Sequence, residues 1–301
     1  MGKIAVEVEE ALARRAIEGT AGRTTSRVLA EGPGWSVSDV LCTSGPGDRP
    51  FEERHAGVSI ALVTSGTFQY RSAAGRALMT PGSLMLGNAG QAYECGHEHG
   101  AGDRCLVFLY DTDTFETLAA HAGRRRQLRP AHGVPAQFAP LRLPPLREMS
   151  DLVARACAAL SESIDLSWEE LAVQMASRAV RISDDITPAA WAASPAAIAR
   201  VTRVARRIER DLASGLSLAE LSREARLSPF HFLRIFQRLT GMTPHRYLRR
   251  ARLREAARRL VAGPGTVLDI ALDSGFGDLS NFNHAFRGEF GVSPRIYRRL
   301  G

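Results

Sequence analysis

The sequence predicts an α+β fold in which an antiparallel β-sandwich or barrel precedes a region made only of helices. Short apolar runs separated by turn residues fill residues 25–110. From Leu146 onward, apolar residues recur at spacings of three and four, which is typical of helices. One helical pattern then occurs twice after residue 196. We therefore expect a β-rich domain, two connecting helices, a linker and a helical domain.

The β-rich domain is assigned to residues 1–145 from its strand-like runs. Segments such as "GVSIALVTSGTFQYRS" and "RCLVFLY" are rich in β-branched and apolar residues and are bounded by turn-forming residues. Runs at this spacing favour an antiparallel sandwich or barrel. The first 20 residues are expected to form a short amphipathic helix or a loose terminus.

Two helices are predicted within residues 146–183, over Leu146–Glu162 and Trp168–Ile182. Ser167 is expected to cap the second helix, whose first turn is acidic. Their apolar stripes are expected either to form a homodimer interface or only to pack on the β-rich domain. The stripes contain Leu152, Ala156, Leu160, Leu171, Met175 and Ala179. Residues 184–195 contain two prolines and are predicted to form a linker.

The C-terminal region, residues 196–301, contains one helical unit twice. Each copy has a short helix, a tight turn and a second helix that ends at a glycine. A helix, a short turn and a helix in a basic segment are typical of a helix-turn-helix unit. A shift of 50 residues places Phe232, Phe236, Gly241, Pro244 and Tyr247 on Phe282, Phe286, Gly291, Pro294 and Tyr297.

A long helix over Pro244–Gly263 is predicted to join the two units. Its apolar positions share one side, so that side is expected to be buried. Its arginines are expected to follow a phosphate backbone. A helix of this length would hold the two units about one turn of DNA apart, roughly 34 Å.

The residues opposite the repeated Phe pairs are the candidate nucleic-acid contacts. At 100° per residue, each Phe pair occupies one face of a helix, and the opposite face is expected to reach solvent. Arginine can bind guanine through two hydrogen bonds, and asparagine or histidine can read base edges. For each residue the alternative is a phosphate contact or a solvated side chain. The candidates are Phe230, His231, Arg234, Arg238, Ser280, Asn281, Asn283, His284 and Arg287.

The charge of the chain is divided unevenly. Residues 196–301 carry 20 arginines, no lysine and 9 acidic residues, a net charge of +11, whereas residues 1–195 have a net charge of −4. A basic domain next to a mildly acidic one indicates a polyanionic partner such as double-stranded DNA. The alternative is a solvated basic surface without a partner.

The chain shows no pattern of a membrane or secreted protein. No apolar run approaches the about 18 residues that span a bilayer, and charged residues interrupt the N-terminus. We therefore expect a cytoplasmic protein without a membrane partner. Its four cysteines are expected to be reduced there.

The segment "YECGHEHGAGDRC" concentrates soft metal ligands. Cys95, His97, His99 and Cys105 are a plausible set for zinc or another thiophilic metal, if two paired strands bring the cysteines together. The spacing matches no standard zinc motif. The alternatives are a buried Cys pair with exposed turn histidines, or a thiol pair that senses oxidants or electrophiles. His55 is a further candidate residue of an effector pocket, and no cofactor is expected to be required.

Residues 196–300 resemble the DNA-binding domain of the AraC/XylS family of bacterial transcription regulators. The resemblance rests on "RLREAARRL" followed by "DIALDSGFGDLSNFNHAFRGEFGVSPRIYR". Ala271 and Asp273 fit the family pattern, whereas Asn281 and His284 replace its commoner basic choices. It implies a cupin-like sensor barrel in residues 1–145, a homodimer, a small-molecule effector and, if the protein is an activator, RNA polymerase as a partner.

The resemblance therefore implies a regulator controlled by a small molecule, a metal or a redox signal, and not an enzyme. One alternative is a metal-dependent cupin enzyme fused to a DNA-binding domain. Another is a DNA-repair protein with a methyl-accepting cysteine. That class needs a zinc site of four cysteines, and the sequence has no Cys-x-x-Cys pair.

Overall fold

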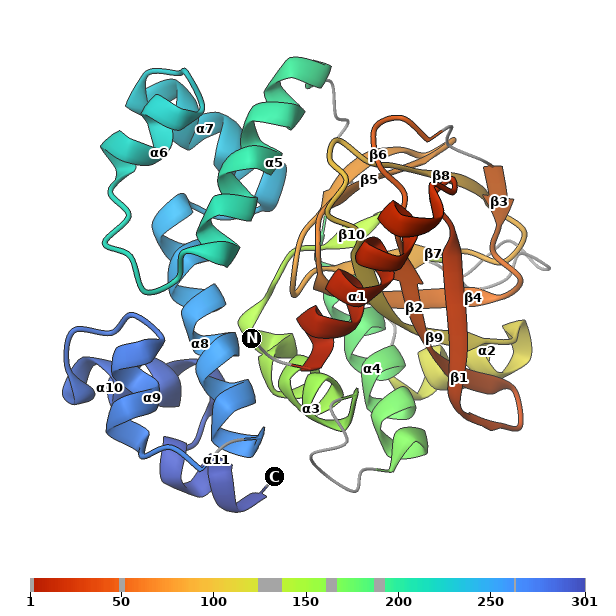
Figure 1. The fold of residues 1–301 in the computed structure, drawn as a ribbon. Coiled ribbons are helices and arrows are strands. Elements are labelled where there is room, and N and C mark those ends of the chain that lie inside the picture. Colours follow the sequence, from red (N-terminus) through yellow and green to blue (C-terminus); the bar gives the residue numbers. More distant parts are fainter. Residues whose placement is uncertain are drawn as a thin grey trace. The chain divides into compact units, whose positions relative to one another are not determined.

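The chain divides into two compact units. The computed structural model describes residues 3–48, 52–123, 137–160, 167–186, 193–262 and 264–300. The N-terminal unit comprises Met1–Pro145 and Ser167–Ala192. The C-terminal unit comprises Leu146–Leu166 and Ala193–Gly301. The elements of both units are labelled in Figure 1. No helix among the described residues is long and apolar enough to cross a membrane.

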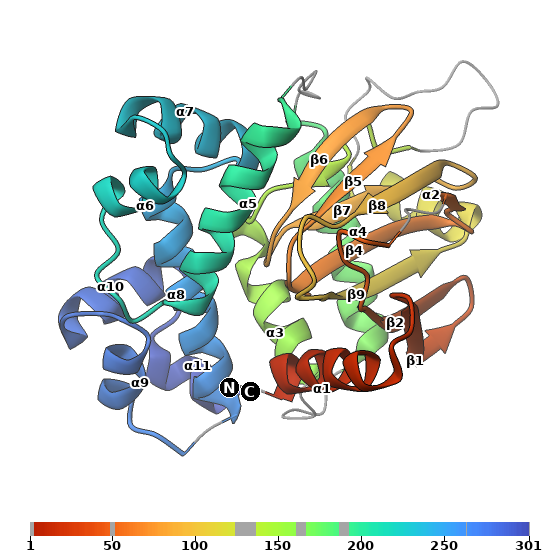
Figure 2. The same ribbon diagram turned by 45° about the horizontal axis from the view of Figure 1, so that its top comes forward.

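The N-terminal unit contains two antiparallel β-sheets (Figure 2). The six-stranded sheet has the order β1 (Thr24–Gly32), β2 (Trp35–Cys42), β9 (Asp103–Tyr110), β4 (Val58–Ser65), β7 (Leu84–Gly87) and β10 (Arg142–Leu143). The four-stranded sheet has the order β3 (Glu52–Arg54), β8 (Ala92–Gly96), β5 (Phe68–Ser72) and β6 (Gly75–Met79). The predicted antiparallel β fold is confirmed, and its strands belong to two separate sheets. A closed cupin-like barrel stays a prediction.

The described part of the N-terminal unit also contains the helices α1 (Lys3–Glu18), α2 (Thr112–His121) and α4 (Trp168–Ser183). Ser167 caps α4 by accepting a hydrogen bond from the Glu170 amide, as expected. Helix α4 packs against β1, β2 and β10. The Tyr110 hydroxyl, at the end of β9, donates to the Ala172 carbonyl at 2.7 Å and so ties the helix to the sheet.

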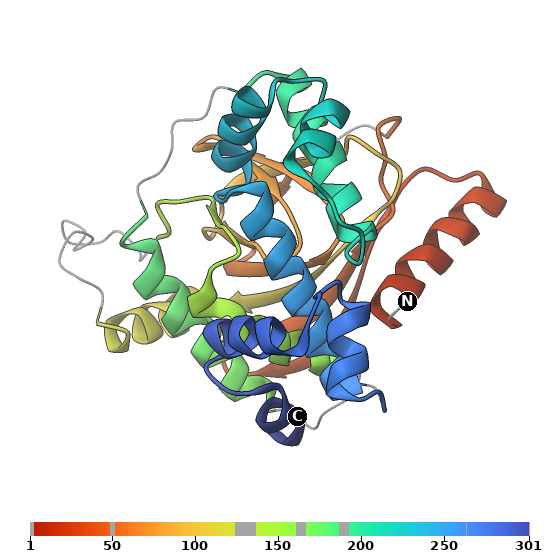
Figure 3. The ribbon, with the colours of Figure 1, turned by 90° about the vertical axis from the view of Figure 1, so that its left-hand side faces the viewer.

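The C-terminal unit consists of helices, as predicted. In chain order they are the 3-10 helix η2 (Arg147–Met149), α3 (Ser150–Leu160), α5 (Pro195–Arg210), α6 (Leu218–Glu224), α7 (Pro229–Thr240), α8 (Pro244–Ala262), α9 (Val267–Asp273), α10 (Leu279–Phe290) and α11 (Pro294–Leu300). Figure 3 shows α8 running from the α6–α7 pair to the α9–α10 pair. The repeat in the sequence is therefore a repeated helix pair with α8 as the connection.

The segment 146–183 is not one structural element, contrary to the expectation. Helix α3 belongs to the C-terminal unit, where it contacts α8 and α10, and α4 belongs to the N-terminal unit. All six residues of the predicted dimer stripes are buried within a single chain. These six side chains are therefore not available as a dimer interface, because an amphipathic pattern shows that a face is buried but not which partner covers it. A homodimer through other surfaces of these helices stays a prediction.

The linker is shorter than the predicted 184–195. Pro195 is the first residue of α5, and the Ser194 hydroxyl caps that helix by accepting from the Ala197 amide at 3.2 Å. Residues 187–192, which include Pro188, lie outside the described residues, as do residues 161 and 162 of the first predicted helix.

Candidate functional site

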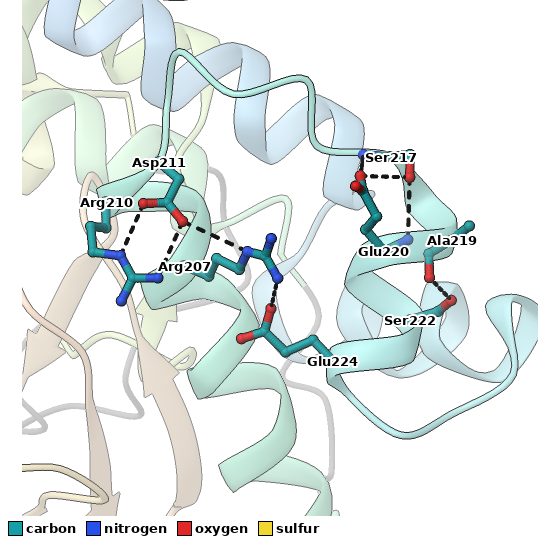
Figure 4. Close-up of polar contacts among 8 residues, drawn as sticks. All are labelled: Arg207, Arg210, Asp211, Ser217, Ala219, Glu220, Ser222 and Glu224. Carbon is teal, nitrogen blue, oxygen red and sulfur yellow. Dashed lines mark hydrogen bonds and ion pairs between the residues drawn. The ribbon is translucent and has the colours of Figure 1, made fainter.

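Both helix pairs start with the same hydrogen-bonded cap. At the start of α6, the Ser217 hydroxyl accepts from the Glu220 amide at 3.2 Å, and the Glu220 carboxylate accepts from the Ser217 amide at 2.8 Å (Figure 4). At the start of α9, Thr266 and Asp269 make the same exchange at 3.1 and 3.2 Å. Each pair satisfies backbone amides that the first helical turn leaves without partners.

The turns between the paired helices have the same backbone and different residues. Arg226 has a φ of 53° and Gly275 has a φ of 88°. The following amides bond back to the first helix, from Leu227 to the Ser222 carbonyl at 3.1 Å and from Phe276 to the Ala271 carbonyl at 3.0 Å. This is the usual end of a helix with a left-handed residue, where glycine is favoured.

The second helix of each pair buries its phenylalanines. Phe232, Phe236, Phe282 and Phe286 are all fully buried, and the rings within each pair lie 5.4 Å apart. In both copies, a tyrosine from the following helix packs edge-on against the second ring, at 5.6 and 5.3 Å. The predicted inner faces of α7 and α10 are therefore confirmed.

The outer faces of α7 and α10 carry the predicted contact residues. All nine candidates are exposed in the structure. Phe230 is the most unusual of them, because its large apolar side chain is 74% exposed. Among the described residues, no carboxylate pairs with Arg234, Arg238 or Arg287. These cations are therefore available to an external anion.

The arginines of α8 are used differently from those of α7 and α10. Arg252 donates to the carbonyls of Leu212 and Ser214 at 2.7 and 2.9 Å, and Arg254 pairs with Glu209 at 2.7 Å. Further pairs join Arg250 to Glu289, Arg258 to Glu255, and Arg259 to both Glu255 and Asp273. The expectation that the arginines of this helix follow a phosphate backbone is wrong for these five, which are engaged within the protein.

An ion-pair network also fixes α6 against α5 (Figure 4). Arg207 of α5 pairs with Glu224 of α6 at 2.6 Å and with Asp211 at 3.7 Å. Arg210 binds the same Asp211 carboxylate through two nitrogens, at 2.9 and 3.1 Å. Two arginines therefore share the Asp211 carboxylate. Its hydrogen bonds to Arg210 are the main reason that the pKa of Asp211 is lowered.

The N-terminal unit contains a second candidate site, a cavity of about 340 Å³ lined by both sheets. Its size falls within the range of small-molecule pockets. The predicted residues His55, Cys95, His97 and Cys105 line it, whereas His99 does not. Apolar side chains such as Val107 and Leu109 form other parts of the wall.

His55 is held in the cavity wall by aromatic and hydroxyl groups. Its Nε2 lies 2.9 Å from the Tyr70 hydroxyl and its Nδ1 lies 2.9 Å from the Ser59 hydroxyl. Its ring stacks on Tyr93 at 4.1 Å between centroids. Burial lowers the pKa of His55 to about 4, so the imidazole is neutral near pH 7. A Cβ on Gly87 would lie 2.3 Å from this ring, so the position requires glycine.

The predicted metal set does not come together as a set. The prediction assumed that the strands of Cys95 and Cys105 pair, but β8 pairs with β3 and β5, whereas β9 pairs with β2 and β4. His99 is buried next to Thr67, whose hydroxyl lies 2.6 Å from its Nε2. Burial also raises the pKa of both Cys95 and Cys105, which disfavours their thiolates.

His97 instead lies beside two residues that the sequence pattern did not indicate. Its Nε2 is 3.7 Å from the Cys42 sulfur and 2.7 Å from an Asp103 oxygen. Burial is the largest single influence on His97 and opposes its charged state, but the hydrogen bonds and charge interactions with Asp103 and Cys42 together outweigh it and raise the pKa of His97 to about 10. Burial likewise opposes the Cys42 thiolate, and the hydrogen bond to His97 lowers the pKa of Cys42.

Only strand register would have revealed this arrangement. Cys42 and Asp103 are direct partners across β2 and β9. They are far apart in the chain, so no local spacing connects them.

The family model that matches this chain lies within the C-terminal unit. Residues 221–300 match a family model described as a helix-turn-helix domain. The chain is 35% identical over 91 residues to the HTH-type transcriptional activator AarP of Providencia stuartii, which covers 30% of this chain and 67% of AarP. It is 37% identical over 101 residues to the HTH-type transcriptional activator RhaS of Klebsiella pneumoniae (strain 342), covering 34% of this chain and 36% of RhaS.

Among solved structures, a probable AraC family transcriptional regulator from Rhodopseudomonas palustris CGA009 is similar to 34% of this chain. The match covers 95% of that structure, at 29% identity and a TM-score of 0.32. The relatives therefore match about a third of this chain, and the match reaches two thirds of the length of AarP but only about a third of RhaS. On the helix-turn-helix match and the identity to AarP, the chain belongs to the AraC/XylS family of transcriptional regulators.

Proposed function

We propose that this protein is a sequence-specific DNA-binding transcription regulator that inserts α7 and α10 into major grooves. The observation that carries the proposal is the exposure of all nine predicted contact residues on helices whose opposite faces are fully buried. A helix with one face fixed in a core and a polar, cationic outer face suits groove insertion. The net charge of +11 over residues 196–301 supplies the attraction to phosphates.

The length of α8 supports simultaneous use of both helix pairs. Its 19 residues correspond to about 28 Å of helix, which approaches the roughly 34 Å between successive major grooves on one face of DNA. The internal pairs of its arginines, such as Arg254 with Glu209, stiffen the connection between the two copies. We infer that α7 and α10 read two half-sites about one turn apart.

The names of two relatives suggest how this protein regulates transcription. AarP and RhaS are both named transcriptional activators. We propose that this chain also activates transcription, through contact with RNA polymerase, and that it acts as a homodimer. No reported relative is named as an enzyme, so the alternative of a metal-dependent cupin enzyme has no support from these comparisons.

The cavity of the N-terminal unit is the proposed effector site. It combines apolar walls with buried polar groups, including the neutral His55 and its hydroxyl partners. Such a mixture of apolar surface and a few oriented polar groups is typical of small-molecule pockets. Because His55 is neutral and both of its ring nitrogens have hydroxyl partners, it lies in the wall without the desolvation cost of a charge.

Selection of bound fragments from genomic DNA, followed by affinity measurements on the recovered site, tests the proposed function. Arg234→Ala and His284→Ala are each expected to weaken binding to this site by about 1–3 kcal/mol, because each removes a base or phosphate contact. Arg203→Ala, which removes an exposed cation of α5, is the matched control. If both variants bind the selected site as tightly as the control does, the assignment of the reading faces is wrong.

A further inference from the structure

We propose that Cys42, His97 and Asp103 form a binding site for a thiophilic divalent cation such as zinc in the wall of the cavity. Of the residues that the structure describes, only this trio brings three donor atoms of His, Cys, Asp or Glu within 4.8 Å of one another. A thiolate, an imidazole nitrogen and a carboxylate oxygen are all usual zinc ligands. All three residues line the cavity.

The fold brings the three donors together from two sheets. Cys42 and Asp103 are opposite each other on β2 and β9 of the six-stranded sheet. His97 directly follows β8 of the four-stranded sheet. A cation bound by the trio would therefore join the two sheets, and it would stiffen the walls of the cavity.

The distances within the trio suit a small tetrahedral ion. Zinc bonds of about 2.0–2.3 Å at tetrahedral angles place neighbouring donors about 3.4–3.6 Å apart. Cys42 Sγ and His97 Nε2 are 3.7 Å apart, close to that separation. His97 Nε2 and Asp103 Oδ2, now hydrogen-bonded at 2.7 Å, would have to move apart by about 0.7 Å, since the ion replaces the ring proton.

A three-ligand site would keep one position for a further ligand. The side chains of His97 and Asp103 are only 5% and 8% exposed, so solvent approaches them from the cavity. In zinc sites with three protein ligands, water or a ligand group occupies the fourth position. We infer that the cation would present this position to an anionic or otherwise electron-rich group of a molecule in the cavity.

The geometry favours a metal over a thiol activated for nucleophilic attack. In a nucleophile–histidine–carboxylate relay, the two ring nitrogens face the two partners separately. Here Cys42 and Asp103 both approach Nε2, so the ring is unable to accept a proton from one partner while the other orients its second nitrogen. One cation in front of Nε2 would contact all three residues at once.

Titration of the full-length, reduced, metal-stripped protein with Co²⁺ tests the proposal. We expect one Co²⁺ per chain, a thiolate-to-cobalt charge-transfer absorption, and displacement of Co²⁺ by zinc. Cys42→Ser, His97→Gln and Asp103→Asn should each lower zinc affinity at least about 100-fold, and Cys42→Ser should abolish the charge-transfer band. His99→Gln and Cys157→Ser are the matched controls and should bind zinc as the wild type does.

The wild-type titration alone can contradict the proposal, so the test remains valid even if one of the variants fails to fold. Absence of the charge-transfer band in the wild type, or an unchanged band in Cys42→Ser, contradicts it. Loss of binding in His99→Gln with retention in Cys42→Ser would restore the hairpin set that the sequence suggested. Rapid alkylation of Cys42 without metal binding would identify a reactive thiol instead. None of these results bears on DNA binding, so the proposed function is tested separately.

Discussion

The two helix-turn-helix units share a fold while they differ in the residues that face outward. Their caps, buried Phe pairs and packed tyrosines correspond one to one. The outer face of α7 carries two arginines, Arg234 and Arg238, whereas that of α10 carries one, Arg287, among neutral polar residues. The comparison teaches that the shared positions determine the fold, and that the outward positions, where we propose that DNA is recognised, are the ones that differ.

The largest expected effect tests whether the two cores are equivalent. Phe236→Ala and Phe286→Ala should each lower the free energy of unfolding by about 3–5 kcal/mol, because both rings are fully buried and leave a cavity. Denaturant unfolding of the full-length protein measures this. Gln237→Ala, an exposed change on the same helix, should stay within about 0.5 kcal/mol. A small loss at only one of the two phenylalanines would show that the cores are not equivalent.

The next largest expected effect is a change in stability that differs in sign between the two turns. The left-handed position is Arg226 in the first turn and Gly275 in the second. Gly275→Ala should destabilise the protein by more than about 1 kcal/mol, because its φ is positive and the added Cβ would lie 2.5 Å from the Leu212 carbonyl. Arg226→Gly should instead stabilise it by about 0.5 kcal/mol, since glycine adopts a φ of 53° without strain. Thermal unfolding of both variants gives the signs, and equal signs would refute the equivalence of the turns.

The sequence was sufficient to predict what repeats and what is periodic. The buried Phe pairs, the exposed candidates and the long connecting helix follow from spacing within one helix, which needs no knowledge of distant contacts. That helix was predicted over Pro244–Gly263 and is observed over Pro244–Ala262, and residue 263 lies outside the described residues. The Gly241 and Gly291 ends are likewise local, and both have a positive φ in the structure. The antiparallel β-rich region was also indicated by its short bounded runs.

What the sequence did not predict depends on partners far away in the chain. Local runs indicate that β8 and β9 are strands, but not that they belong to different sheets, so the assumed pairing of these strands is wrong. Cys95 and Cys105 nevertheless lie near each other, because Cys95 packs against the apolar cluster that contains Cys105. The sequence did not identify Cys42 as a site residue, because its position beside Asp103 depends on the register of β2 with β9. The apolar stripe of α3 was recognised, but its partner α8 was not, because periodicity identifies a buried face alone.

A smaller effect distinguishes the chemistry of the two outer faces. If α7 contributes more charge to binding than α10 does, Arg234→Ala should reduce the slope of log affinity against log salt by about 1. Asn281→Ala should leave that slope unchanged while it weakens binding to the selected site, since it removes a neutral side chain. Affinities measured over a series of salt concentrations decide between them. Equal slopes in both variants would contradict a difference in charge between the two faces.

Footprinting of the full-length protein on its selected site tests the central claim most directly. The claim is that one chain reads DNA with both α7 and α10. For each bound chain, the account predicts two protected major-groove segments about one helical turn apart, roughly 10 base pairs, on one face of the duplex. Arg234→Ala should weaken protection of one segment and His284→Ala that of the other. A single protected segment that responds to Arg234→Ala but not to His284→Ala would contradict the account.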